Sequence, residues 1–267
     1  MIDCDGERGK NKKEGRKERK CKREREGEMR KREKEAEINH LKNVELKLAF
    51  DNLNKEKIRS DELLLNILPE EVAEEIKTTG SARAKRFDSV SVMFIDIRNF
   101  TLITQQLSPE DLVAEIDFVF KGFDEIIKRY DIEKIKTIGD AYMCASGLPI
   151  PYPHHALNMV DAAFDIIIFM ETVKQLRLQE HKTYFEVRIG INSGAVVAGI
   201  VGSSKFAYDI WGDTVNTAAR IEQNSEVGKI NISDTTYELV KDRYTCTYRG
   251  EIEAKNKGKL NMYFVSR

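Results

Sequence analysis

Residues 89–97 read SVSVMFIDI, a mostly apolar run from which the fold prediction starts. A short run of β-branched and other apolar residues between polar segments is typical of a buried strand. Asp96 lies at the end of the run, where a carboxylate is unfavourable unless it is paired or bound to a cation. The stretch therefore predicts the first strand of a folded domain and marks Asp96 as a candidate functional residue.

Helix and strand patterns alternate downstream of this strand. KIKTI and AYMCASG are two strand-like runs joined at Gly139-Asp140, which indicates a hairpin. FEVRIGIN and AVVAGIVG predict a second hairpin around Ser193-Gly194. Further patterns predict helices over residues 109–129, 155–178 and from Asp213 through Arg220, and strands over residues 229–232, 245–252 and 260–265. Together they predict an α+β sandwich, with helices on one face of a mainly antiparallel sheet.

Two segments of different composition precede the domain, which we place at residues 86–267. Residues 1–37 are rich in Lys, Arg and Glu and cannot bury enough apolar area to fold alone, which predicts a disordered or solvated helical head. Residues 38–85 form a helical connector with apolar residues at helical spacing, namely Ile38, Leu41, Val44 and Leu48. Because Asp51 and Lys55 interrupt this row, a parallel coiled coil and a helix packed on its own domain both remain open.

The overall composition excludes several function classes. The 267 residues are 41% hydrophobic, which is enough for a sizeable core, and 44 basic and 45 acidic side chains leave a formal net charge of -1. This balance points away from nucleic acid and from anionic membranes. The four cysteines lack a paired spacing, and no transmembrane run or secretory signal occurs. We therefore expect a cytoplasmic protein with no membrane span and no nucleic-acid partner.

A second acidic residue, Asp140, lies at the tip of the first predicted hairpin, where Asp is also common for local reasons. If the strands that carry Asp96 and Asp140 are neighbours, the two carboxylates can hold hard cations together with substrate phosphates. The IRNFT segment after the first strand offers backbone N–H groups to a polyphosphate, and a Walker-type phosphate loop is absent from the sequence. These features predict a metal-dependent phosphoryl-transfer site.

Four longer motifs carry a resemblance to a known family. VSVMFIDIRNFT, KIKTIGDAYM, VRIGINSGAVVAGIVG and YDIWGDTVNTAARIE occur in this order, and together they resemble the class III adenylyl and guanylyl cyclases. The resemblance covers about residues 87–267. It implies a ferredoxin-like α+β unit that works as a dimer, with active sites across the interface.

The resemblance also implies roles for individual residues. Asp96 and Asp140 look like the pair that binds two divalent cations, Mg²⁺ or Mn²⁺, with the Ile97 carbonyl as a further ligand. In the family the ribose 3′-oxygen of the nucleotide attacks the α-phosphorus and pyrophosphate leaves. By resemblance Asn216 orients the ribose, and Arg220 neutralises charge on the α-phosphate in the transition state.

The base-contacting positions of the family are occupied here by Lys136 in KIKTIG and Asp209 in YDIWG. Adenine-specific members resemble this chain in carrying Lys and Asp, whereas guanine-specific members usually place Glu and Cys there. A Lys can donate to N1 of adenine and an Asp can accept from its amino group, and guanine reverses both polarities. ATP is therefore the predicted substrate and cyclic AMP the predicted product.

The phosphate-binding positions depart from the family pattern in two places. Lys255 in KNKG matches a triphosphate-binding lysine, although Asn256 stands where the family often has glycine. Phe100 and Thr101 belong to the phosphate loop IRNFT, in which Asn99 also replaces a frequent glycine. Asn tolerates positive φ better than most residues, so both turns can be kept.

In the family, Asp96 and Asp140 act from one protomer, whereas Lys136, Asp209, Asn216, Arg220 and Lys255 act from the other. Since one chain carries both sets, the expected assembly is a homodimer. Three alternatives remain: a catalytically silent dimerisation or ATP-sensing module, a guanylate cyclase or another enzyme of palm-like fold, and a scaffold built on the charged N-terminal helix. The start of the chain also resembles the tail of a longer protein with an upstream sensor domain.

Overall fold

The computed structural model describes residues 5–202, 206–254 and 258–267. The chain divides into two compact units, Met1–Leu63 and Leu64–Arg267, each described here by itself. Lys255 falls outside the described residues, so its predicted contact with the triphosphate remains a prediction.

The first unit is formed by the helix α1 (Asp5–Leu65), whose last two residues belong to the second unit and whose many Glu, Lys and Arg residues are strong helix formers. The helix continues without interruption through residues 37 and 38, where the sequence predicts a change from head to connector. Apolar side chains of the connector are exposed on it, among them Ile38, Leu41 and Leu48. The predicted domain boundaries and the coiled coil remain predictions. None of the helices in the described chain is long and apolar enough to cross a membrane.

The second unit is built around a mostly antiparallel sheet. Its first part follows a βαββαβ order, the ferredoxin-like arrangement, through β1 (Lys85–Ile97), α4 (Pro109–Lys128), β2 (Glu133–Ile138), β3 (Ala141–Ser146), α5 (His155–Gln179) and β4 (Val187–Val201). These strands lie in the order β2-β3-β1-β4, and each neighbouring pair is antiparallel. The predicted α+β class and the hairpin at Gly139-Asp140 are confirmed.

Further elements extend this unit beyond β4. The strands are β5 (Ala207–Trp211), β6 (Ile230–Ser233), β7 (Thr245–Ala254) and β8 (Gly258–Ser266), and the helices are α2 (Glu70–Thr79), α3 (Phe100–Thr104), α6 (Asp213–Gln223) and α7 (Asp234–Val240). β5 folds back on β4 as an antiparallel partner, whereas β6 pairs with β4 in parallel. β8 and β7 then complete the sheet.

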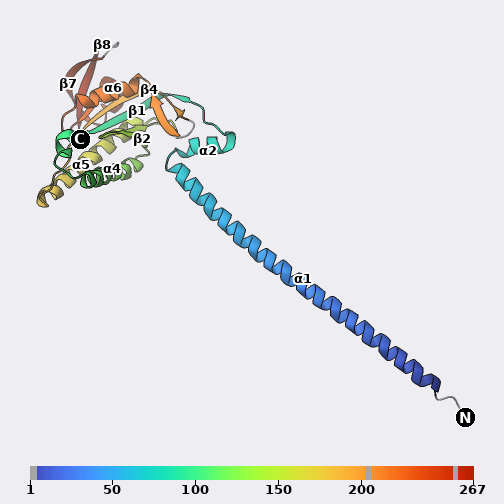
Figure 1. The fold of residues 1–267 in the computed structure, drawn as a ribbon. Helices are drawn as coiled ribbons and strands as arrows, with labels where there is room; N and C mark the ends of the chain where they lie inside the picture. Colours follow the sequence, from blue (N-terminus) through green and yellow to red (C-terminus); the bar gives the residue numbers. More distant parts are fainter. Residues whose placement is uncertain (1–4, 203–205, 255–257) are drawn as a thin grey trace. The chain divides into compact units, whose positions relative to one another are not determined.

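The sheet separates two hydrophobic cores. Successive side chains of β1 point to opposite faces, so Met93 and Ile95 pack with α4 and α5, whereas Val92 and Phe94 pack with α2 and α6. Figure 1 shows α4 and α5 on one side of the sheet and α6 on the other. The expectation that helices cover one face only is therefore wrong. It fails because strand β1 is apolar on both faces, and both faces must be covered.

The second predicted hairpin, around Ser193-Gly194, is also wrong. Val187–Val201 form one continuous strand, and Ser193 and Gly194 pair with Ser91 and Val90 of β1 in its interior. Gly194 is needed for packing, because a Cβ there would lie 2.8 Å from the Thr214 Oγ1 of α6. The glycine therefore marks the close approach of a helix, which a sequence pattern cannot separate from a turn.

Candidate active site

The sheet brings Asp96 and Asp140 together. Asp96 pairs with Ala141 in the β1–β3 register, and Asp140 immediately precedes Ala141 at the tip of the β2–β3 hairpin. Burial raises the pKa of Asp140, and the neighbouring Asp96 carboxylate raises it further, whereas Arg188 lowers it. The predicted acidic pair is thus a spatial pair whose negative charges repel each other.

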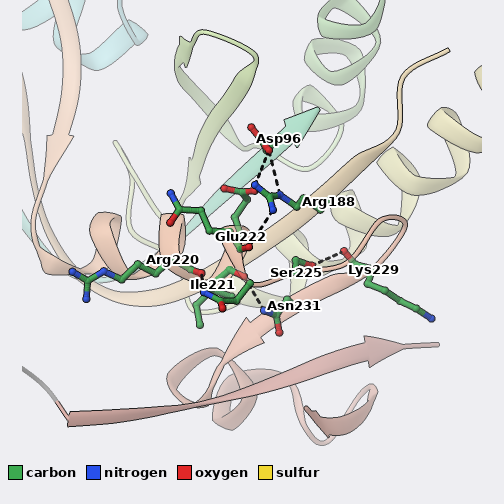
Figure 2. A network of polar contacts seen from close by, with 10 residues as sticks. Asp96, Arg188, Arg220, Ile221, Glu222, Ser225, Lys229 and Asn231 are labelled. Carbon is green, nitrogen blue, oxygen red and sulfur yellow. Dashed lines mark hydrogen bonds and ion pairs between the residues drawn. The ribbon is translucent and has the colours of Figure 1, made fainter. Parts of the chain in front are cut away.

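Arg188 is the direct partner of Asp96. It lies opposite Asp96 on β4, and its Nη2 and Nε donate to Asp96 Oδ2 at 2.9 Å and 3.2 Å. Its Nη1 donates to the carbonyl of Gln223 at 3.1 Å, at the end of α6. Figure 2 shows the guanidinium lying between Asp96 and Glu222. The same side chain therefore contacts the candidate metal-binding strand and helix α6.

Glu222 completes this cluster from helix α6. Its side chain is buried, and its Oε1 lies 2.5 Å from Arg188 Nε as an ion pair that lacks hydrogen-bond alignment. Burial raises the pKa of Glu222 to about 7, Asp96 adds to the shift, and Arg188 opposes it. Sequence analysis missed Arg188 and Glu222. For Arg188 the available signal was the one that identified Asp96, a charged residue inside an otherwise apolar segment, whereas the polar segment around Glu222 offers no such signal.

The cluster carries an excess of negative charge that suits a divalent cation. Asp96, Asp140 and Glu222 supply three carboxyl groups against one guanidinium. Among the described residues, no group of three or more His, Cys, Asp or Glu side chains forms a ready metal site. A cation on Asp96 and Asp140 would therefore take its remaining ligands from backbone and substrate oxygens, as Mg²⁺ commonly does. Asp96 and Asp140 therefore fit a Mg²⁺ or Mn²⁺ ion that shares its coordination with backbone and substrate oxygens.

Lys136 and Asp209 form a second cluster. Lys136 projects from β2 and Asp209 from β5, and Lys136 Nζ lies 2.5 Å from Asp209 Oδ2. Asp209 Oδ1 also accepts a hydrogen bond from the backbone N–H of Ile210 at 2.9 Å, which fixes the carboxylate. The structure thus brings together the two residues predicted to contact the base, although they are far apart in sequence.

Asn216 and Arg220 lie one turn apart on α6, as predicted. Asparagine side chains fix this helix at both ends: Asn192 Nδ2 donates to the Thr214 carbonyl at 3.0 Å, and Asn231 Nδ2 donates to the Ile221 carbonyl at 2.8 Å. In Figure 2 the Arg220 side chain points away from Asp96. Within one chain, then, the predicted transition-state arginine and the predicted metal ligand do not converge.

The predicted phosphate loop lies directly after β1. Asn99 adopts the left-handed conformation with φ 58°, and its carbonyl accepts from the backbone N–H groups of Leu102 and Ile103 to open α3. Phe100 packs on the core beside Phe185, with ring centroids 6.2 Å apart. The roles of Phe100 and Thr101 in phosphate binding remain predictions.

An α+β sandwich with paired carboxylates at the ends of its central strands has the features expected of a metal-dependent phosphoryl-transfer domain. The family model described as "Adenylate and Guanylate cyclase catalytic domain" matches residues 68–267. The chain belongs to this family of class III cyclases. The resemblance inferred from the four motifs is confirmed.

Similar proteins include both cyclase types. An adenylate cyclase of Mycobacterium tuberculosis (strain ATCC 25618 / H37Rv) is 39% identical over 208 residues, which cover 78% of this chain and 46% of that protein. The adenylyl cyclase CyaB from P. aeruginosa is similar in structure, with a TM-score of 0.66 at 30% identity, covering 70% of this chain and 97% of that one. The catalytic core of a rhodopsin-guanylyl cyclase with converted specificity, in complex with ATPαS, has a TM-score of 0.64 at 39% identity. The match covers 69% of this chain and 98% of that one.

The chain thus spans about half the length of the mycobacterial relative that it matches. The family membership concerns the catalytic domain, and it leaves the choice between ATP and GTP open, because the similar proteins are named both adenylate cyclase and guanylate cyclase.

Proposed function

We propose that this protein is an adenylyl cyclase, which converts ATP to 3′,5′-cyclic AMP and pyrophosphate in a homodimer. The observation that carries this proposal is the Lys136–Asp209 pair, with Nζ and Oδ2 2.5 Å apart. A lysine donor beside a fixed aspartate acceptor matches N1 and the N6 amino group of adenine, and it opposes the donor and acceptor pattern of guanine.

The acidic pair supplies the other half of the proposed site. Asp96 and Asp140 would hold Mg²⁺ or Mn²⁺, with the Ile97 carbonyl beside them. When bound, such cations lower the pKa of the ribose 3′-hydroxyl and neutralise phosphate charge. The 3′-oxygen then bonds to the α-phosphorus, the bond from that phosphorus to the bridging oxygen breaks, and the hydroxyl proton passes to solvent. Asn216 would orient the ribose, and Arg220 would stabilise the charge that develops on the α-phosphate.

The homodimer is part of the same proposal. Asp96 pairs with Arg188, whereas the Arg220 side chain on α6 points away from Asp96. In the proposed mechanism, one chain therefore carries two separate halves of an active site. A second copy related by a two-fold axis would supply the missing half to each site and create two equivalent sites.

The direct experiment is to incubate the purified chain with ATP or GTP and with Mg²⁺ or Mn²⁺, and to measure cyclic nucleotide and pyrophosphate. We expect cyclic AMP and pyrophosphate in equal amounts, with little cyclic GMP. Cyclic GMP as the main product would replace this proposal with a guanylyl cyclase. No cyclic product from a confirmed dimer would favour a catalytically silent module.

A further inference from the structure

Arg188 occupies one of the two carboxylate oxygens of Asp96, the proposed cation ligand. Its Nη2 and Nε both donate to Asp96 Oδ2, at 2.9 Å and 3.2 Å. Hydrogen bonds between charged groups are among the stronger ones in proteins, and this pair is largely shielded from solvent. A divalent cation on Oδ2 would have to displace these hydrogen bonds, and a cation on the other oxygen would lie close to the positive guanidinium, so Arg188 opposes cation binding in either case.

The guanidinium has two further acceptors that would keep it paired after such a shift. Glu222 Oε1 lies 2.5 Å from Nε, and the Gln223 carbonyl accepts from Nη1 at 3.1 Å. Both acceptors belong to the C-terminal turn of α6, the helix that carries Arg220. Arg188 therefore lies between two carboxylates that compete for it, as Figure 2 shows.

The position of Glu222 is fixed by its surroundings. Its side chain is 5% exposed, and its backbone sits directly on β4 at Gly190, where no Cβ could be accommodated. Asn231 of β6 binds the carbonyl of the preceding residue, Ile221, at 2.8 Å. Because the Glu222 backbone is held in place, its carboxylate cannot follow Arg188 towards Asp96. The guanidinium, which is hydrogen-bonded to Asp96 and only ion-paired with Glu222, must move away from Asp96 to bind Glu222 more closely.

We propose that Arg188 and Glu222 act as a positioning pair, in which Arg188 competes with the divalent cation for Asp96 and Glu222 receives the displaced guanidinium. This inference rests on the proposed metal site at Asp96. It assigns to Glu222 an effect on cation affinity that acts through Arg188, with no contact between Glu222 and the cation. It also links cation binding at Asp96 to helix α6 of the same chain, which would serve the other active site of the dimer.

The test measures Mn²⁺ affinity by electron paramagnetic resonance in the wild-type chain, in Glu222→Gln, in Arg188→Gln and in the double variant, all without nucleotide. We expect Glu222→Gln to weaken Mn²⁺ binding about 5-fold and Arg188→Gln to strengthen it about 5-fold. In the Arg188→Gln background, we expect Glu222→Gln to change affinity by less than about 2-fold, because no guanidinium is left to receive.

The matched control is Glu186→Gln, which removes the same charge from a carboxylate paired with Lys174 at 2.6 Å. It should leave Mn²⁺ affinity within about 2-fold of the wild type. Equal effects of Glu222→Gln in both backgrounds would mean that its charge acts through space, and this would overturn the proposed transfer of the guanidinium.

Two further outcomes separate this inference from the proposed function. If Mn²⁺ binding is not abolished by Asp96→Ala, then the proposed metal site fails and this inference fails with it. If binding does depend on Asp96 but Arg188→Gln weakens it or leaves it unchanged, then only the competition is wrong. The Arg188→Gln measurement decides the competition even if Glu222→Gln does not fold, which a thermal unfolding curve would reveal.

Discussion

At the scale of single residues, Glu133 at the start of β2 experiences an unusual environment. Burial raises its pKa from the ordinary value of 4.5 to about 7, and the carboxylate of Glu71 on α2 adds to the shift. The two residues line a cavity of about 580 Å³ together with Lys128 and Asp131. Near neutral pH the folded chain thus keeps a carboxyl group that is only partly ionised, on the strand that carries Lys136.

This environment predicts a pH dependence of stability. Because the folded chain binds the Glu133 proton more tightly, its contribution is fully present below the unfolded pKa of 4.5 and is lost as the pH rises through 7. Glu133→Gln keeps the shape without the charge, so it should be more stable than the wild type at pH 8, by about 2 kcal/mol, and nearly equal at about pH 4.

Urea unfolding at several pH values measures this difference, and the comparison of the two chains cancels the contribution of Glu222. Glu253→Gln, at an exposed position on β7, is the control and should show no such divergence. A constant difference between Glu133→Gln and the wild type across the pH range would contradict the assignment.

A second prediction at this scale concerns base selection by Lys136 and Asp209. The double variant Lys136→Glu/Asp209→Cys exchanges a donor for an acceptor and removes the fixed carboxylate, so the ratio of kcat/KM for ATP to that for GTP should fall at least about 100-fold. The control Lys121→Glu changes the charge of an exposed lysine on α4 and should keep the ratio. A double variant that still prefers ATP as strongly as the wild type would remove the basis for the adenine assignment.

At the scale of elements, helix α6 packs closely against β4 at Gly190 and Gly194, which lie four residues apart on one face of the strand. A Cβ at Gly190 would collide with the backbone nitrogen of Glu222, and one at Gly194 would press on Thr214. The close approach brings Glu222 to Arg188. The helix position thus depends on two residues that carry no side chain.

This seating predicts a large effect of Gly190→Ala. The new methyl group cannot be accommodated without moving the α6 backbone, so we expect a loss of about 3 kcal/mol in the free energy of unfolding. Gly27→Ala in α1, where nothing lies within 4 Å of the added Cβ, should not destabilise the chain. Thermal unfolding monitored by circular dichroism checks both, and equal effects of the two substitutions would show that α6 can move freely.

The elements also show which parts of the fold the sequence could predict. The hairpin at Gly139-Asp140 was predicted because a local signal is sufficient there, and Gly139 has φ 63° as a turn requires. Ser193-Gly194 carries a similar signal, but Gly194 makes room for a distant helix. The Asp96–Arg188 contact depends on strand register between residues 92 positions apart, which packing determines and no local pattern reveals.

At the scale of the whole molecule, the predicted site residues divide into two groups within one chain. Asp96 and Asp140 meet at the ends of β1 and the β2–β3 hairpin, and Lys136 meets Asp209 across β2 and β5. Arg220 projects from α6 away from Asp96. The proximity of Asp96 to Asp140 and of Lys136 to Asp209 agrees with the sequence analysis, whereas the joining of these pairs into one site by a second copy of the chain belongs to the proposed homodimer.

This division predicts complementation between two inactive variants. Asp96→Ala removes a proposed metal ligand and Arg220→Ala the proposed transition-state arginine, so each variant alone should lose nearly all activity. When the two chains are co-expressed and assemble at random, about half of the dimers contain one of each, and each mixed dimer has one intact site. We therefore expect about one quarter of the wild-type activity per chain. The measurement is cyclic AMP formation by the co-expressed chains, compared with co-expression of either variant with itself. If the active site lay within a single chain, mixing would restore nothing, since every chain would carry a lesion in its own site.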